Sequence, residues 1–207
     1  MKLRLYWGSV MAQTAANFIT FTDFLADSSG RPGPSVLLTT GDVITVPTES
    51  ELNSYLATVL QMALIKFVPL RLVKTHTVTL EIEPTGDNWR NRYPDLLVLR
   101  PEHIDLMAET KQAAIQLGMP APQFVAEVVS PGPETSDNYR RDYDWKRRQY
   151  EHWEIPEYWI IDPVRAKVTV LVLEQGHYRE EIYQDEQWIE SSVFPKLRLQ
   201  ANSILIA

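Results

Sequence analysis

The chain has 207 residues, of which 44% are hydrophobic and 23% charged, a balance typical of globular domains and not of disordered or fibrous chains. It contains no cysteine, which excludes disulfides, thiolate metal sites and a cysteine nucleophile, so a metal ion would need oxygen or histidine ligands. Its 27 acidic and 20 basic residues give a net charge of −7. A nucleic acid would therefore have to be bound by a local basic strip, a metal ion or an oligomeric groove.

The beginning of the chain predicts no membrane span and no signal peptide. No apolar run approaches the roughly 20 residues that a span needs. Polar residues interrupt the first apolar run before a signal-peptide core could form: Gly8, Ser9, Gln13 and Thr14. We therefore expect a cytoplasmic protein with no membrane partner. Met11 is an alternative start to Met1, and nothing in the sequence decides between them.

Residues 1–35 are predicted to form an N-terminal extension with a leading helix, and residues 36–207 the main domain. Three aromatic residues recur at roughly helical spacing in the extension: Phe18, Phe21 and Phe24. A cluster of serine, glycine and proline at 28–34 ends the segment. The extension is therefore expected to be a short helix followed by a loop.

The main domain is predicted to start with a β-hairpin and a helix. Apolar residues at 36–40 and 43–46 flank Gly41-Asp42, which indicates a tight turn. Residues 47–50 then supply cap chemistry for a helix with an apolar stripe: Leu52, Leu56, Val59, Leu60, Ala63 and Phe67. After this helix, residues 76–83 alternate apolar and polar side chains, as a half-buried strand does.

Two continuous apolar runs, 96–99 and 124–129, have the length of strands and predict central strands that are covered on both faces. We expect a helix over 102–118 between them and another over 137–153. Further strands are predicted at 158–161, 168–173 and 178–183, with Gln175-Gly176 joining the last two as a hairpin. This order indicates a single α/β domain in which helices flank a central mixed β-sheet.

Two carboxylates stand in these apolar runs. Glu127 shares a strand face with Val125 and Val129, because side chains alternate along a strand. Asp95 stands at the entrance of the other run, after Pro94. A buried carboxylate needs a cation, hydrogen bonds or a proton. Each residue alone has an ordinary alternative, since Glu127 could reach solvent or pair with an arginine and Asp95 could be solvated.

Considered together, the two acids favour a metal site. Neighbouring central strands would bring both carboxylates to one place, and converging carboxylate oxygens are what Mg²⁺ requires. The cation would in turn keep both groups ionised.

Lys146 occupies a position at which a core-facing helix normally carries leucine or isoleucine. It completes an aromatic stripe of the 137–153 helix, formed by Tyr139, Tyr143, Tyr150 and Trp153. We therefore predict that the lysine points toward the sheet, where its ammonium could orient an attacking water or stabilise the charge of a pentacovalent phosphate. The alternative is that its stem packs on the tyrosines while the ammonium reaches water.

These residues lie in segments that resemble the PD-(D/E)XK nuclease superfamily, and within it the Uma-type family of restriction-endonuclease-like proteins. The resemblance covers roughly residues 35–200, and the matching segments follow in order: 92–98, 125–131, 144–150, 155–163 and 194–197. It implies a restriction endonuclease-like fold for 36–207 and metal-dependent hydrolysis of phosphodiester bonds, with DNA as the expected substrate and a homo-oligomer, a dimer, as the expected assembly.

The resemblance also implies roles for particular residues. Asp95 and Glu127 would bind Mg²⁺ or Mn²⁺ and form the catalytic set with Lys146. The superfamily pattern has a lysine two residues after the glutamate, where this chain has Val129; in the Uma-type family the lysine lies on the following helix, as Lys146 does. Glu51 aligns with a family metal-site position that more often carries histidine. Its alternative role is that of an ordinary acid in a first helical turn.

Four arginines on the 137–153 helix are candidate phosphate contacts: Arg140, Arg141, Arg147 and Arg148. The alternative is a solvated helix face that is balanced by acids: Asp137, Asp142, Asp144 and Glu151. The rival function is a catalytically inactive nuclease-fold module that binds nucleic acid or serves as an oligomeric interaction protein, which the negative charge and the missing strand lysine favour. The sequence has no G-x-S-x-G turn, which argues against a serine hydrolase.

Overall fold

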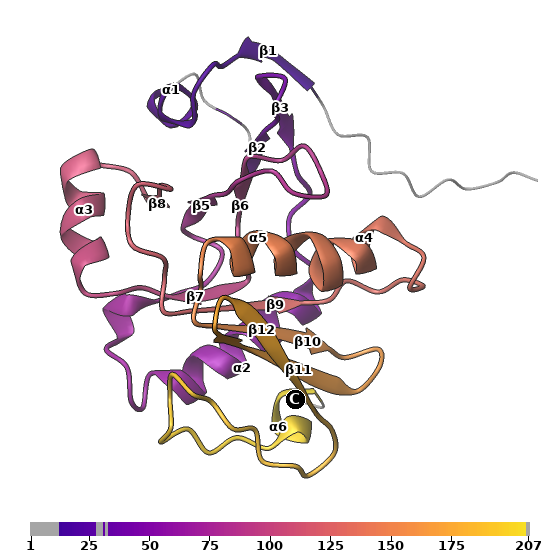
Figure 1. The fold of residues 1–207 in the computed structure, drawn as a ribbon. Coiled ribbons are helices and arrows are strands. Elements are labelled where there is room, and N and C mark those ends of the chain that lie inside the picture. Colours follow the sequence, from indigo (N-terminus) through magenta and orange to yellow (C-terminus); the bar gives the residue numbers. More distant parts are fainter. Residues whose placement is uncertain (1–12, 28–30, 32, 206–207) are drawn as a thin grey trace, which may run out of the picture.

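The computed structural model describes residues 13–27, 31 and 33–205 (Figure 1). Its centre is a six-stranded sheet in the order β12-β11-β10-β9-β7-β4. The strands are β4 (Val73–Lys74), β7 (Leu96–Val98), β9 (Phe124–Val128), β10 (Glu157–Asp162), β11 (Lys167–Glu174) and β12 (His177–Tyr183). Strands β9 and β10 are parallel and the other neighbours antiparallel. The expected α/β domain with a mixed central sheet is confirmed.

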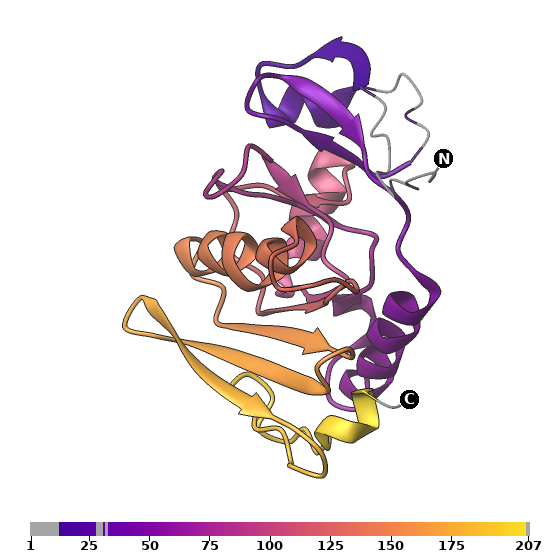
Figure 2. The ribbon, with the colours of Figure 1, turned by 90° about the vertical axis from the view of Figure 1, so that its right-hand side faces the viewer.

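Helices cover both faces of this sheet (Figures 1 and 2). On one face Leu96 and Ala126 pack with side chains of α2 (Glu51–Leu64) and α6 (Ala201–Leu205). On the other, Leu97 and Val125 pack with Tyr150 from the helix that follows β9. The continuous apolar runs of β7 and β9 follow from this arrangement, because both faces exclude water and each buried aliphatic side chain contributes about 1.5–3 kcal/mol.

Helix α2 begins where the cap residues predict. The hydroxyl of Ser50 accepts a hydrogen bond from the backbone N–H of Asn53 at 3.1 Å. The buried stripe is Leu56, Ala57, Leu60 and Leu64, together with Asn53. The predicted stripe is right in its centre, but its ends are not buried, since Leu52 is 40% exposed and Phe67 is 45% exposed.

The helix expected over 137–153 is present as one continuous helical stretch with a wide turn in its middle. It consists of α4 (Asp137–Arg140), the π-helical η2 (Arg141–Trp145) and α5 (Lys146–His152). Ser136 caps its start by accepting a hydrogen bond from the N–H of Tyr139 at 3.2 Å. A π turn spends one more residue per turn than an α-helix does and often occurs at functional sites.

The helix expected over 102–118 is shorter than predicted. Helix α3 (Glu102–Thr110) ends at Lys111, which has a left-handed backbone with φ of 55°. The chain then forms β8 (Ala114–Ile115), which pairs in parallel with β5 (Thr79–Glu81) in a small sheet of order β6-β5-β8 completed by β6 (Asn91–Arg92). Strand β5 is the middle of the strand expected over 76–83.

The N-terminal part forms a second small sheet, in the order β1-β3-β2. The expected hairpin is present as β2 (Ser35–Leu37) and β3 (Asp42–Thr45), and the leading helix as α1 (Phe21–Ala26). Strand β1 (Gln13–Asn17) was not predicted. Gly41 is required in the turn, because its φ is 88° and a Cβ there would lie 2.8 Å from the carbonyl oxygen of Phe18. The division of the chain at residue 35 stays a prediction.

Two further features complete the fold. The 3₁₀ turn η1 (Leu70–Leu72) leads directly into β4, which forms the sheet edge opposite β12. Among the described residues, none of the helices combines the length and the apolar character required to cross a membrane.

Candidate functional site

Asp95 and Glu127 lie side by side at one end of the central sheet. Strands β7 and β9 are antiparallel with Leu96 opposite Ala126, so continuing the register by one residue places Asp95 opposite Glu127. Each acid also binds the other's strand: the N–H of Val128 donates to Asp95 Oδ2 at 2.6 Å, and the N–H of Asp95 lies 3.4 Å from Glu127 Oε2. Asp95 is 3% exposed and Glu127 is 1% exposed. The solvated alternatives for these acids are therefore not what the structure shows.

Lys146 approaches the two acids from the covering helix. It is the first residue of α5, directly after the π turn. Its Nζ lies 2.9 Å from Glu127 Oε2 and 2.7 Å from Asp142 Oδ1. Its side chain is 13% exposed, so the ammonium faces the carboxylates and not the solvent. The structure thus brings together the three residues at which the sequence analysis placed catalysis.

Asp142 corrects one sequence expectation. The sequence analysis placed it among the acids of a solvated helix face, but it is buried and pairs with Lys146. The spacing of four residues, with the acid on the N-terminal side of the lysine, is visible in the sequence as an ion-pair signal.

Tyr150 holds the other oxygen of Glu127. Its hydroxyl donates to Glu127 Oε1 at 2.7 Å, and the tyrosine is fully buried. Glu127 therefore has Tyr150 on one carboxylate oxygen and Lys146 on the other. Burial and the charge of Glu127 raise the pKa of Tyr150 well above its ordinary value, so this hydroxyl acts as a donor throughout the physiological pH range.

The acids are not neutralised by the lysine alone. Burial and the charges of Glu127 and Glu49 raise the pKa of Asp95 well above its ordinary value, although the charge of Lys146 lowers it. Burial likewise raises the pKa of Asp142, against the opposing effect of Lys146. A single ammonium thus faces several buried carboxylates, and the excess negative charge requires protons or a further cation.

Lys146 itself stays protonated. Burial alone would lower its pKa, but the carboxylates of Asp142, Glu127 and Asp95 outweigh burial and raise the pKa above its ordinary value. The lysine can therefore supply positive charge and hydrogen bonds, and it cannot serve as a general base at neutral pH.

Three residues that were not predicted as site residues lie near the two acids: His76, Asn53 and Glu49. His76, with a left-handed φ of 50°, places Nδ1 3.5 Å from Asp95 Oδ1, and its buried Nε2 has no hydrogen-bond partner. Asn53 donates from Nδ2 to the carbonyl oxygen of Val128 and to Glu49 Oε2, each at 3.2 Å. Only Asn53 carried a sequence signal, as a polar residue within the apolar face of α2.

Glu51 is placed differently from the two acids of the sheet. It is exposed on the first turn of α2, and the charge that affects Asp95 from this region is that of Glu49. Its role as a metal ligand stays a prediction. Among the described residues, no group of three or more histidine, aspartate or glutamate side chains is arranged to hold a metal ion.

Asp95 and Glu127 nevertheless fit a magnesium-type cation. Such ions are commonly held by one or two carboxylates, while water and substrate phosphates fill the other positions. The buried carboxylates of Asp95, Glu127 and Asp142 face one ammonium, that of Lys146, so the charges of the site include an excess of acid. A divalent cation would remove this excess.

The four arginines of the covering helix are mostly engaged by their neighbours. Ion pairs join Arg140 to Asp137 at 3.7 Å, Arg147 to Glu180 at 2.7 Å and Arg148 to Asp144 at 2.6 Å. Arg141 donates to Asn138 at 3.3 Å and lies over the ring of Trp89. The arrangement favours charge balance within the protein, and a role of these arginines in binding nucleic acid stays a prediction.

A mixed six-stranded sheet with helices on both faces, and a buried group of acids and a lysine at one sheet end, defines the class of this protein as a single α/β domain with a candidate site at the end of its sheet. The chain belongs to the family described as "Uma2: Putative restriction endonuclease", whose sequence model matches residues 23–202. The resemblance inferred from the sequence is thereby confirmed.

One solved structure supports the same fold. The chain is similar to a protein of Anabaena variabilis ATCC 29413 described as a "putative nuclease belonging to DUF820", with a TM-score of 0.58 and 17% sequence identity over 88% of this chain and 97% of that one. No curated protein matches the chain.

Proposed function

We propose that this protein is a metal-dependent endonuclease that hydrolyses phosphodiester bonds, with DNA as its substrate. The observation that carries the proposal is the convergence of Asp95, Glu127 and Lys146, which are buried together at one end of the central sheet. Membership of the family described as "Putative restriction endonuclease" supports the reaction class.

Asp95 and Glu127 are the residues that would hold Mg²⁺ or Mn²⁺, with Glu51 as a third candidate ligand. The ion, when bound, would polarise a phosphate oxygen and lower the pKa of a bound water. Asp95 is fixed for this role by the N–H of Val128, and Glu127 by Tyr150.

Lys146 supplies the remaining positive charge. Because its pKa is raised, its ammonium stays charged and can stabilise the charge that develops on the phosphate, or orient a water through a hydrogen bond. Asp142 positions this ammonium through its 2.7 Å contact. Asp142 and Tyr150 therefore act as positioning residues, since their contacts are to Lys146 and Glu127.

A second function, that of a catalytically inactive module that binds nucleic acid or mediates oligomer formation, is favoured by one observation. Lys146 pairs with both Glu127 and Asp142 within the protein, so this part of the site is satisfied without a substrate. The net charge of −7 agrees with this alternative.

The experiment that separates the two functions is cleavage of supercoiled plasmid DNA and of RNA by the full chain with Mg²⁺ or Mn²⁺. The nuclease proposal expects cleavage that Asp95→Asn and Lys146→Met reduce about a hundredfold or more. A calorimetric titration with Mn²⁺ accompanies it. The absence of both cleavage and Asp95-dependent Mn²⁺ binding would overturn the proposal and support the module.

A further inference from the structure

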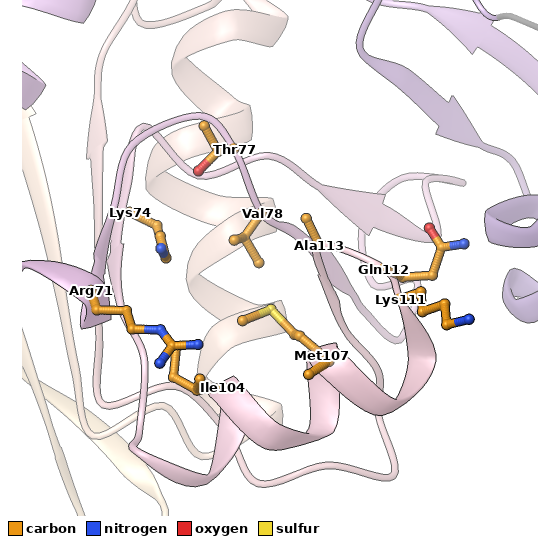
Figure 3. A pocket seen from close by; sticks show the side chains of 10 residues that line it. Arg71, Lys74, Thr77, Val78, Ile104, Met107, Lys111, Gln112 and Ala113 are labelled. Atoms are coloured by element: carbon orange, nitrogen blue, oxygen red, sulfur yellow. The ribbon is translucent and has the colours of Figure 1, made fainter.

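A second feature of the surface lies beside β4, the edge strand that pairs with β7 of the candidate site. It is an open hollow of about 470 Å³ between β4, the segment that follows it and α3. Arg71 comes from η1, Lys74 from β4 and Lys111 from the end of α3. In Figure 3, Arg71 and Lys74 lie on one side of the hollow and Lys111 lies at the opposite rim.

The charge of this hollow is wholly positive. Its lining contains three basic side chains and no acidic one. Within the part of the chain that the structure describes, no ion pair involves Arg71, Lys74 or Lys111. In a chain with a net charge of −7, three basic groups free of carboxylate partners form a local site for an anion.

The phase of α3 explains why its own acids do not neutralise the hollow. Successive residues of an α-helix are about 100° apart, so Ile104 and Met107 share one face, the face that lines the hollow, and Lys111 follows directly after the last turn. The acids of this helix lie roughly 100–160° away around its axis: Glu102, Asp105 and Glu109. The helix thus presents apolar and basic residues to the hollow and directs its acids elsewhere.

The floor of the hollow is apolar. Val78 and Met107 lie in its middle, and Ile104 lies beside Arg71 (Figure 3). Basic groups at the rim and aliphatic groups at the floor match a ligand that carries phosphates on a carbon framework. A sugar–phosphate backbone has this chemistry, with phosphates for the cations and deoxyribose or ribose for the floor.

The chain connects this hollow directly to the candidate site. Lys74 pairs with Leu97 of β7, two residues from Asp95. Strand β4 runs antiparallel to β7, so the residues that follow Lys74 approach Asp95. The Nδ1 atom of His76 lies 3.5 Å from Asp95 Oδ1. The next two residues, Thr77 and Val78, line the hollow. A strand of nucleic acid that occupied the hollow would therefore lie close to the buried acids.

We propose that this hollow, formed by Arg71, Lys74, Lys111 and the apolar floor, binds the sugar–phosphate backbone of the nucleic-acid substrate beside the site of cleavage. The proposal rests on the proposed nuclease function. It differs from the expectation based on the helix arginines, because those are engaged within the protein whereas the three cations of the hollow are not.

The test measures binding and not cleavage. Fluorescence anisotropy of a labelled DNA duplex is recorded with the full chain in EDTA at several salt concentrations. The triple variant Arg71→Gln/Lys74→Gln/Lys111→Gln is compared with Arg179→Gln/Lys196→Gln/Arg198→Gln, which removes the same charge from β12 and the C-terminal segment. We expect the first variant to bind about tenfold more weakly or worse, and the salt dependence of log K to fall by about 3, roughly one per phosphate contact. The second variant should behave like the parent protein.

Several outcomes would overturn the proposal: no binding of DNA or RNA by the parent protein, equal loss in both triple variants, or an unchanged salt slope in the first. A mononucleotide or inorganic phosphate that displaces the duplex at micromolar concentration would assign the hollow to a small anion instead. Binding with the expected salt slope but without any cleavage in Mg²⁺ would leave this proposal standing while the proposed nuclease function fails.

Discussion

The ammonium of Lys146 lies 2.9 Å from Oε2 of Glu127, and the two residues come from a helix and from the strand beneath it. The position two residues after Glu127, directly past the end of β9, is occupied by Val129, which is 1% exposed and packed in the core. The strand therefore contributes carboxylate and hydrophobic packing, and the helix contributes the positive charge.

Replacement of Lys146 by methionine tests this division. The variant would leave Glu127 and Asp142 without their counter-charge, so we expect a loss of about 3–5 kcal/mol in the free energy of unfolding at pH 7.5. The pKa of Lys146 is raised in the fold, so its stabilisation is fully present below the pKa of an unfolded lysine and is lost only as pH rises through the higher folded value. Urea unfolding curves measure the loss.

The double variant Lys146→Met/Asp142→Asn is the control for this experiment. Removing one of the unpaired acids should restore part of the stability, and a double-mutant cycle gives the coupling. Additive losses would contradict the ion pair. Lowering the pH toward 5 should also reduce the deficit of Lys146→Met, because the pKa of Asp142 is already raised and its carboxylate would become neutral.

Asp95→Asn should stabilise the protein at alkaline pH while it impairs the site. Burial raises the pKa of Asp95, so in the parent protein the stability from this group is complete below the pKa of an unfolded aspartate and is lost as pH rises through the folded pKa. The asparagine can still accept the hydrogen bond from Val128 and carries no charge. We expect a gain of about 1 kcal/mol at pH 8 and a flatter pH profile in urea unfolding. A steeper pH dependence of stability in Asp95→Asn than in the parent protein would contradict a raised pKa of Asp95.

Metal binding should appear as stabilisation before any activity is measured. If Asp95 and Glu127 hold Mn²⁺, an ion concentration a hundred times the Kd raises the free energy of unfolding by about 2.7 kcal/mol. Thermal unfolding of the parent protein should therefore shift upward with Mn²⁺. Glu127→Gln and Asp95→Asn should show no shift, and an equal shift in all three proteins would place the ion elsewhere.

Tyr150→Phe and Tyr143→Phe form a matched pair on the same helix. The hydroxyl of Tyr150 donates to Glu127, whereas that of Tyr143 donates to Asp162 Oδ2 at 2.9 Å. Both changes should cost about 1–3 kcal/mol, because each removes a hydrogen bond to a buried carboxylate, although Glu127 keeps Lys146 and Asp162 keeps Arg165. Only Tyr150→Phe should lower kcat and weaken Mn²⁺ binding. If both variants lowered kcat equally, the effect would be explained by the loss of stability and not by the contact of Tyr150 with Glu127.

Arg148→Gln tests the helix arginines. Its ion pair with Asp144 is largely exposed, with side chains 61% and 38% exposed. We expect a change of at most about 0.5 kcal/mol in stability and a smaller effect on nucleic-acid affinity than the three changes in the hollow. Anisotropy titrations measure the affinities. If Arg148→Gln lost more nucleic-acid affinity than Arg71→Gln, the result would instead support the helix arginines as phosphate contacts.

The elements that could be predicted are those whose pattern repeats within the element. The apolar runs of β7 and β9 predict strands that are buried on both faces. The helical phase of the covering helix predicts that Lys146 points toward the sheet. The convergence of Asp95 and Glu127 followed from placing both acids on neighbouring central strands. In each case the local pattern and the tertiary environment agree.

The elements that escaped prediction depend on partners far away in the chain. Strands β4 and β8 have two residues each, which is too short to show a period, and they exist because β7 and β5 offer hydrogen bonds. His76 reaches Asp95 only through the pairing of β4 with β7. Asp142 was assigned to the solvated helix face although its spacing of four residues from Lys146 is an ion-pair signal.

The π turn at Arg141–Trp145 sets the rotation between two halves of one helix. Within it, Tyr143 donates a hydrogen bond to Asp162 of β10; after it, Lys146 and Tyr150 contact Glu127 of β9. If the same residues formed a regular α-helix without this wide turn, everything that follows would be rotated by about 100°, because the π turn takes up one more residue per turn. The ammonium of Lys146 would then point away from the acids. The extra residue of the wide turn therefore keeps Lys146 and Tyr150 directed at Glu127.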